Sequence, residues 1–87
     1  MSYLLIHHKV RDFDTWKKAY DGHRDARDQA GLKELHLLRN HADRNDIVIL
    51  FTTEDLERAR AFARSDNLRS AMQQAGVVGA PVLLELE

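Results

Sequence analysis

The sequence predicts an α+β domain of the ferredoxin-like type, with the order βαββαβ and a four-stranded antiparallel sheet covered by helices on one face. The length of 87 residues suffices for one small domain. Hydrophobic residues make up 44% and charged residues 31%, as in soluble globular proteins. Strand-like apolar runs and helix-like spacings of three and four follow one another in the stated order. We therefore treat residues 1–87 as a single domain.

The first predicted element is a strand over residues 2–10, which are rich in Leu, Ile, His and Val. Side chains alternate between the two faces of a strand. One face would carry Leu4, Ile6, His8 and Val10, and the other Tyr3, Leu5, His7 and Lys9. Because both faces carry apolar groups, we expect this strand to be covered on both sides.

A helix is predicted over residues 13–30. Asp12 has the side chain of a helix N-cap, whose carboxylate accepts from amides of the first turn. The buried stripe follows spacings of three and four, namely Phe13, Trp16, Tyr20, His23, Arg27 and Ala30. Gly31 fits the left-handed position that ends a helix.

The second half of the chain predicts two strands, a helical segment in two pieces and a final strand. The strands cover residues 32–40 and 47–52, separated by a polar turn. The helical segment opens at Thr53 and its two following acids, is capped afresh at Ser65 and ends at Gly76. Pro81 leads the last strand, which suits an edge.

The predicted sheet has the strand order fourth, first, third, second. The first and third strands carry the most continuous apolar runs, which suits the two central places. Two helices cover one face only, so the other face would expose residues such as Leu5, Leu35 and Leu37. We expect a homodimer in which the two open faces pack together and enclose a space.

Three segments carry a resemblance to a known family: residues 8–16, 38–40 and 65–81. They resemble small bacterial proteins of the dimeric α+β barrel superfamily, which also contains antibiotic-biosynthesis monooxygenases, polyketide cyclases and haem-degrading enzymes. The resemblance spans residues 3–86, and its most specific part is residues 65–81. It implies a dimeric barrel more firmly than a particular chemistry.

The branches of that superfamily differ in what they require. The haem-degrading branch uses an Asn on the first strand and a His on the second helical segment, and this chain has neither. The resemblance to the monooxygenase branch implies no metal and no flavin, since an electron-rich aromatic compound can itself react with oxygen. The protein would supply enclosure, a proton acceptor and positioned donors. We therefore expect no cofactor.

Candidate catalytic residues are His7 and Arg39, with Leu5 and Leu37 lining the space between the sheets. His7 would take a proton from a phenol or enol, and Arg39 would hold the resulting anion. The alternatives remain open. His7 can be a histidine hydrogen-bonded within the dimer interface, and Arg39 can pair with acids of the following turn.

Tyr20 and His23 on the first helix are candidates for lining a mouth of the cavity. The alternative places Tyr20 in the core beside Trp16, with its hydroxyl reaching water.

Several other classes of site are not expected. His7 and His8 are adjacent on a strand and point to opposite faces, and His23, His36 and His41 have no ligand spacing. Without cysteine there is no thiolate site, so no metal centre is expected.

The net charge of −1 and the lack of a basic stripe argue against nucleic acid as a partner. The longest apolar run, residues 47–51, is too short to span a membrane, and no signal peptide is recognised. We expect a cytoplasmic protein.

Two functions remain after these exclusions. The first is a cofactor-independent monooxygenase-like or cyclase-like enzyme acting on an aromatic or polyketide-like compound. The second is a non-catalytic dimer that binds a small ligand or serves as an accessory protein. A cavity with polar groups would favour the first, and a space filled by apolar side chains the second.

Overall fold

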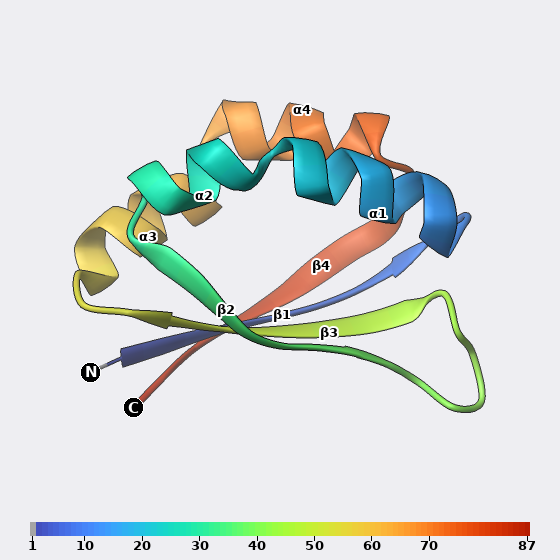
Figure 1. The fold of residues 1–87 in the computed structure, drawn as a ribbon, viewed down its shortest axis with the longest axis horizontal. Helices are drawn as coiled ribbons and strands as arrows, with labels where there is room; N and C mark the ends of the chain where they lie inside the picture. Colours follow the sequence, from blue (N-terminus) through green and yellow to red (C-terminus); the bar gives the residue numbers. More distant parts are fainter. Residues whose placement is uncertain (1) are drawn as a thin grey trace.

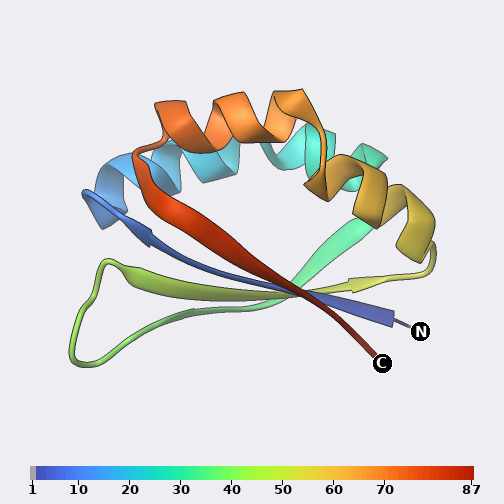
Figure 2. The same cartoon turned by 180° about the vertical axis from the view of Figure 1, so that it is seen from behind.

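The computed structural model describes residues 2–87 and has the predicted ferredoxin-like α+β architecture (Figure 1). The strands are β1 (Ser2–Val10), β2 (Leu32–Arg39), β3 (Asp46–Thr53) and β4 (Val77–Leu86). The helices are α1 (Phe13–Gly22), α2 (Arg24–Gln29), α3 (Leu56–Ala63) and α4 (Asp66–Gln74). The sheet has the order β2-β3-β1-β4 with every neighbouring pair antiparallel, which confirms the predicted topology. All helices lie on one face of the sheet (Figures 1 and 2).

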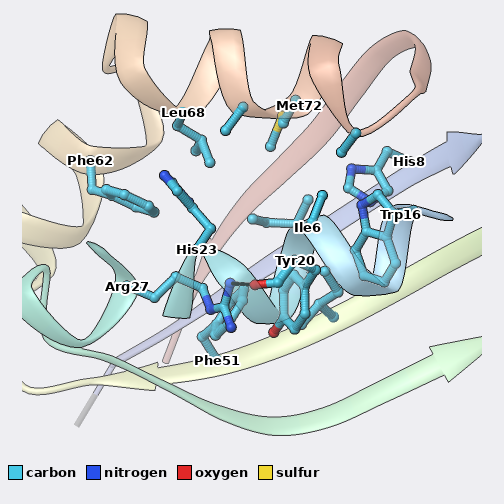
Figure 3. A pocket seen from close by; sticks show the side chains of 14 residues that line it. Ile6, His8, Trp16, Tyr20, His23, Arg27, Phe51, Phe62, Leu68 and Met72 are labelled. Atoms are coloured by element: carbon cyan, nitrogen blue, oxygen red, sulfur yellow. Dashed lines mark hydrogen bonds between the residues drawn. The ribbon is translucent and has the colours of Figure 1, made fainter. Parts of the chain in front are cut away.

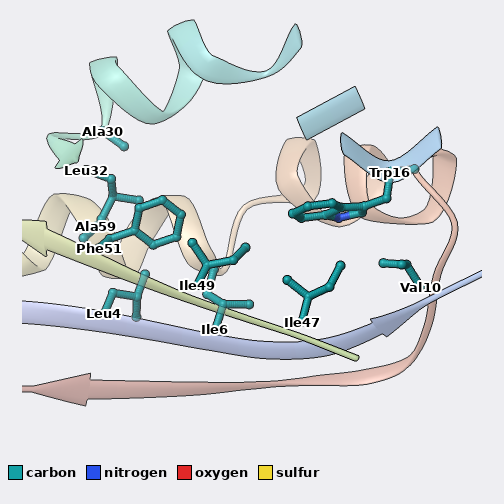
Figure 4. Packing of buried hydrophobic residues seen from close by; sticks show 11 residues of the cluster. Leu4, Ile6, Val10, Trp16, Ala30, Leu32, Ile47, Ile49, Phe51 and Ala59 are labelled. Atoms are coloured by element: carbon teal, nitrogen blue, oxygen red, sulfur yellow. The ribbon is translucent and has the colours of Figure 1, made fainter. Parts of the chain in front are cut away.

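The core lies between the helices and the two central strands (Figure 4). Alternation along β1 is as predicted, since Leu4, Ile6 and Val10 are at most 4% exposed and face the helices. The partner strand β3 contributes Ile49, paired with Ile6, and Phe51, paired with Leu4. Fully burying side chains of this size contributes roughly 1.5–3 kcal/mol each, which makes this cluster the main source of stability.

The predicted helix over residues 13–30 is in fact two helices, and the prediction of one continuous helix is wrong. The chain leaves helical geometry at His23, whose φ is −97° and ψ is 11°. Gly22 precedes the break, and glycine weakens a helix interior by about 1 kcal/mol relative to alanine. The predicted ends are confirmed: Asp12 accepts from the Thr15 amide, and Gly31 has a φ of +78°.

The second helical segment begins later than predicted. Thr53 remains in β3, and its hydroxyl bonds the backbone of Asp55, which is the true N-cap of α3. The new cap at Ser65 is confirmed, because its hydroxyl accepts from the Leu68 amide. Gly76 follows α4 with a φ of +88°, where its carbonyl accepts from the Arg11 amide.

The two edge strands depart from regular pairing, and each departure corrects an expectation. In β2 the register against β3 shifts between Glu34 and His36, so Leu35 is an extra residue. In β4 the register against β1 shifts opposite His7 and Lys9, where Gly79 has a φ of +73°. Pro81 therefore lies inside β4 rather than at its start, and it is tolerated because an edge strand needs fewer backbone donors.

The sheet face without helices, here called the open face, is apolar as expected. This face carries the odd-numbered residues of β1 and the residues of the other strands paired with them. Its apolar members include Leu5, Leu38, Val48, Leu50, Val78, Val82, Leu84 and Leu86. Leu38, Val82 and Leu84 are 46–55% exposed in the single chain. Leu37, by contrast, packs against the core on the helix side, so its predicted place on the open face is wrong.

Candidate functional site

A cavity of about 50 Å³ lies between the helices and the sheet, lined by residues of all four helices and both central strands (Figure 3). Most of its wall is apolar. The apolar side chains include Ile6, Ile49, Phe51, Phe62, Leu68 and Met72. Besides the rings of Trp16 and Tyr20, the basic side chains of His8, His23 and Arg27 interrupt that wall. A concave apolar space with a few polar groups is the usual form of a small-molecule site.

His8 is the most unusual group in this wall. Its side chain is only 5% exposed, and neither ring nitrogen has a hydrogen-bond partner. The ring meets Trp16 edge to face, with 5.5 Å between centroids. Burial lowers the pKa of His8 to about 4, helped by the neighbouring His7 and opposed by Asp46. At neutral pH the imidazole is therefore uncharged, with one donor and one acceptor unused.

His23 enters the cavity from the break between α1 and α2. Its ring stacks on Phe62 of α3, with 5.9 Å between centroids, and its Nε2 is buried without a partner. The interruption at Gly22 thus gives the cavity a second imidazole with an unsatisfied nitrogen. Leaving a buried polar atom unsatisfied costs about 1–3 kcal/mol, which a bound molecule with matching groups would recover.

Arg27 and Tyr20 form a tight pair beside the cavity. The guanidinium carbon lies 3.6 Å from the centre of the Tyr20 ring, and Nη1 donates to the Tyr20 carbonyl at 2.6 Å. The Tyr20 ring also stacks on Trp16 at 4.8 Å. Its hydroxyl donates to Glu34 at 2.7 Å; burial, followed by this bond, raises the pKa of Tyr20 above its usual range. Tyr20 is therefore a wall of the site and not a source of protons.

The structure places the predicted site residues on two different faces. His7 and Leu5 lie on the open face, where His7 Nε2 is 2.7 Å from Asp46 Oδ1. Tyr20 and His23 line the cavity on the helix side. Arg39 also lies on the helix side, stacked 3.7 Å above the Phe13 ring, with its Nε donating to the Arg44 carbonyl.

His7 and Arg39 therefore do not meet. Arg39 pairs with Ile47, whose side chain is fully buried under the helices, whereas His7 pairs with Val48 on the opposite face. The expectation that both side chains would line one space between two sheets is therefore wrong. The cause is that β2 carries leucines on both faces, so its sequence does not say which face meets the core.

His8 and Arg27 were not among the site residues predicted from the sequence. One signal was present, because His8 is a polar residue on the alternating face that carries Leu4, Ile6 and Val10. Arg27 likewise occupies the apolar stripe of its helix and is only 9% exposed. A titratable group on a core-facing position is the feature that marked this site.

Two further observations limit the kinds of site present. Within residues 2–87, no three His, Asp or Glu side chains gather in a way that could hold a metal ion. None of the helices in the described part of the chain is long and apolar enough to cross a membrane.

Comparisons with known proteins rest on structure alone. No protein-family model matches the sequence, and no curated protein matches it either. Among solved structures, a candidate antibiotic biosynthesis monooxygenase from Bordetella bronchiseptica is similar, with a TM-score of 0.78 at 11% identity, covering 99% of this chain and 94% of that one. SnoaB, a cofactor-independent oxygenase from Streptomyces nogalater, gives 0.70 at 13% identity, covering 95% of this chain and 89% of its own.

A third structure, a candidate antibiotic biosynthesis monooxygenase from Caulobacter crescentus, gives a TM-score of 0.71 at 17% identity, covering 98% of this chain and 86% of that one. At such low identity the agreement concerns the fold. The chain has the ferredoxin-like α+β fold of antibiotic biosynthesis monooxygenase-like proteins.

Proposed function

We propose that the cavity under the helices binds a small hydroxylated aromatic compound and that the protein is a cofactor-independent monooxygenase-like enzyme. The observation that carries this proposal is His8, a buried imidazole with two unused nitrogens in an otherwise apolar cavity. The fold shared with SnoaB, a cofactor-independent oxygenase, supports the same reaction class. A phenolic hydroxyl offers the donor and acceptor that such an imidazole lacks.

The proposed chemistry converts a phenol and one molecule of O₂ into a quinone and one water. His8 accepts the phenolic proton, and the electron-rich phenolate then gives up electrons to O₂ as a carbon–oxygen bond forms at an ortho position. The proton on His8 passes to the resulting peroxide. Loss of the hydrogen at that ortho carbon as a proton and cleavage of the O–O bond release water and leave the second carbonyl of an ortho-quinone.

The low pKa of His8 in the free protein is compatible with this role. Burial disfavours the imidazolium because no anion lies in the cavity to balance it. A phenolate formed beside the ring would supply that anion and raise the pKa of His8 in the complex. The buried guanidinium of Arg27 adds positive charge to the same wall.

The cavity volume sets the size of the substrate. About 50 Å³ holds waters, whereas a dry cavity of about 150 Å³ is known to accept a benzene ring. Entry of one ring therefore requires a wall to move, and the unbranched thioether of Met72 is the most adaptable group there. A single ring suits this cavity better than the fused rings of a polyketide.

We also propose that two chains pack open face against open face. Leu38, Val82 and Leu84 of that face are about half exposed in the single chain, and a second copy would remove them from water. In that arrangement the His7–Asp46 pair would lie within or beside the interface, which favours the interfacial role for His7 over a catalytic one.

A non-catalytic binding protein is the second candidate function. The observation that favours it is the pKa of His8 itself, since an imidazole near 4 is a weak base before any ligand arrives. The hydroxyl of Tyr20 is also committed to Glu34 and cannot assist.

One experiment separates these functions. The protein is mixed with 4-propylphenol while Trp16, the sole tryptophan and part of the cavity wall, reports binding by its fluorescence and an electrode reports O₂ uptake. We expect saturable binding with O₂ uptake, and a loss of turnover of about 100-fold in His8→Phe. The control is His41→Ala, at an exposed turn position, which should behave as the unchanged protein.

The outcomes are distinct. Binding without O₂ uptake would overturn the enzyme and support the binding protein. If Trp16 fluorescence does not respond to the phenol at all, the cavity is not a site and both functions fail.

A further inference from the structure

A second hollow, of about 260 Å³, lies directly outside the cavity, between the two C-terminal helices and the edge strand β4. Leu68 and Met72 line both spaces, so these two side chains lie between them. The outer hollow continues over Pro81 and Leu83 of β4. Movement of these two side chains of α4 would join the outer hollow to the cavity that holds His8.

The two side chains of this partition are not equally constrained. Leu68 is buried, at 9% exposed, whereas Met72 is only partly buried, so Met72 is the less constrained of the two. Met72 has an unbranched side chain that rearranges at low cost. Under it, β4 breaks its regular pairing with β1 between Val78 and Val82, which leaves the floor of the hollow irregular.

The outer hollow carries positive charge. Arg64 and Arg69 line it, both are exposed, and neither takes part in a salt bridge within residues 2–87. Glu85 already accepts from Nε and Nη2 of Arg60, at 2.8 and 2.6 Å. Asp66, in the first turn of α4, is within salt-bridge distance of neither arginine.

We propose that this outer hollow is the entrance to the cavity and that it selects aromatic compounds carrying a carboxylate. The ring would pass between Leu68 and Met72 with its hydroxyl toward His8, while the carboxylate would stay outside with Arg64 and Arg69. The inference rests on the proposed binding function and adds to it the charge of the ligand and the side from which it enters. Guanidinium groups bind carboxylates in a directed, bidentate way.

The test compares two probes that differ in the carboxylate alone. They are 3-(4-hydroxyphenyl)propionate and the neutral 4-propylphenol, each titrated against Trp16 fluorescence at low salt. Exposed ion pairs are individually weak, so we expect the carboxylate to bind only about threefold to tenfold more tightly. The preference should shrink as salt is added.

The variant R64Q/R69Q should remove this preference without changing the affinity for 4-propylphenol. Its matched control is Arg44→Gln, an exposed arginine in the turn before β3, which should keep the preference. Equal binding of the two probes to the unchanged protein, or a preference that persists in R64Q/R69Q, would overturn the entrance while leaving the cavity intact. Failure of both probes to bind would overturn the cavity as well.

Association rates of the two probes test whether ligands enter between Leu68 and Met72. Met72→Ala should raise the association rate of both probes at least threefold, whereas Gln74→Ala, on the exposed side of α4, should not. Association rates unchanged in Met72→Ala would contradict entry between Leu68 and Met72.

Discussion

Acidification to pH 5 should destabilise the protein by about 2 kcal/mol through His8 alone. Its pKa is about 4 in the folded chain and 6.5 when unfolded. The unfolded chain therefore binds the proton first, so stability is complete above pH 6.5 and falls as the pH drops toward 4. The full difference of 2.5 pKa units corresponds to about 3 kcal/mol at 1.36 kcal/mol per unit, of which about 2 is reached at pH 5.

The assay is urea unfolding at pH 7.5 and pH 5, followed by circular dichroism at one fixed protein concentration because association affects apparent stability. His8→Leu removes the titrating ring and fills its place with an apolar side chain. The pH effect should be about 2 kcal/mol smaller in this variant than in the unchanged protein. The carboxyls of Asp12, Asp46 and Glu85 have pKa values held below their usual range by hydrogen bonds, so their contributions fall outside this window.

The control is His41→Ala, at an exposed turn position, which should retain the full pH effect. If His8→Leu loses as much stability on acidification as the unchanged protein, His8 is not buried without partners. The reasoning about the cavity would then be refuted.

Four other substitutions test the fold and the open face. Leu5→Asp should give a folded monomer, with a mass of 10.0 kDa in light scattering, in place of a dimer. Leu37→Asp, on the core side, should instead lower the free energy of unfolding. The reverse pattern would contradict the assignment of the two residues to opposite faces. Phe51→Ala should lower the free energy of unfolding by about 3–5 kcal/mol in urea, and a loss below 1 would show that the core is elsewhere. Ser65→Ala should cost about 1 kcal/mol through the lost cap of α4, and no loss would mean that another group caps this helix.

Local signals explain why the fold could be predicted from the sequence. The caps at Asp12 and Ser65 and the glycines after α2 and α4 act within a few residues, so their chemistry is readable without tertiary structure. The apolar runs of β1 and β3 likewise identify the central strands, because they are the most continuous in the chain.

The site was less predictable because the positions of its residues depend on strand register and on contacts between elements far apart in the sequence. β2 has leucines on both faces and an extra residue at Leu35, so only its pairing with β3 decides that Leu37 faces the helices. The position of His23 likewise depends on a contact between distant residues. The His23 ring lies in the cavity because it stacks on Phe62, a residue of α3 far along the chain.

In our proposal the ligand site lies under the helices at His8 and not on the open face at His7. NMR can distinguish the two places by following the ring resonances of both histidines during a titration with 4-propylphenol. We predict that the His8 resonances shift along a saturation curve matching that of Trp16 fluorescence, while those of His7, bonded to Asp46 on the opposite face, stay in place. Shifts at His7 with none at His8 would place the site between the sheets and refute the proposed site.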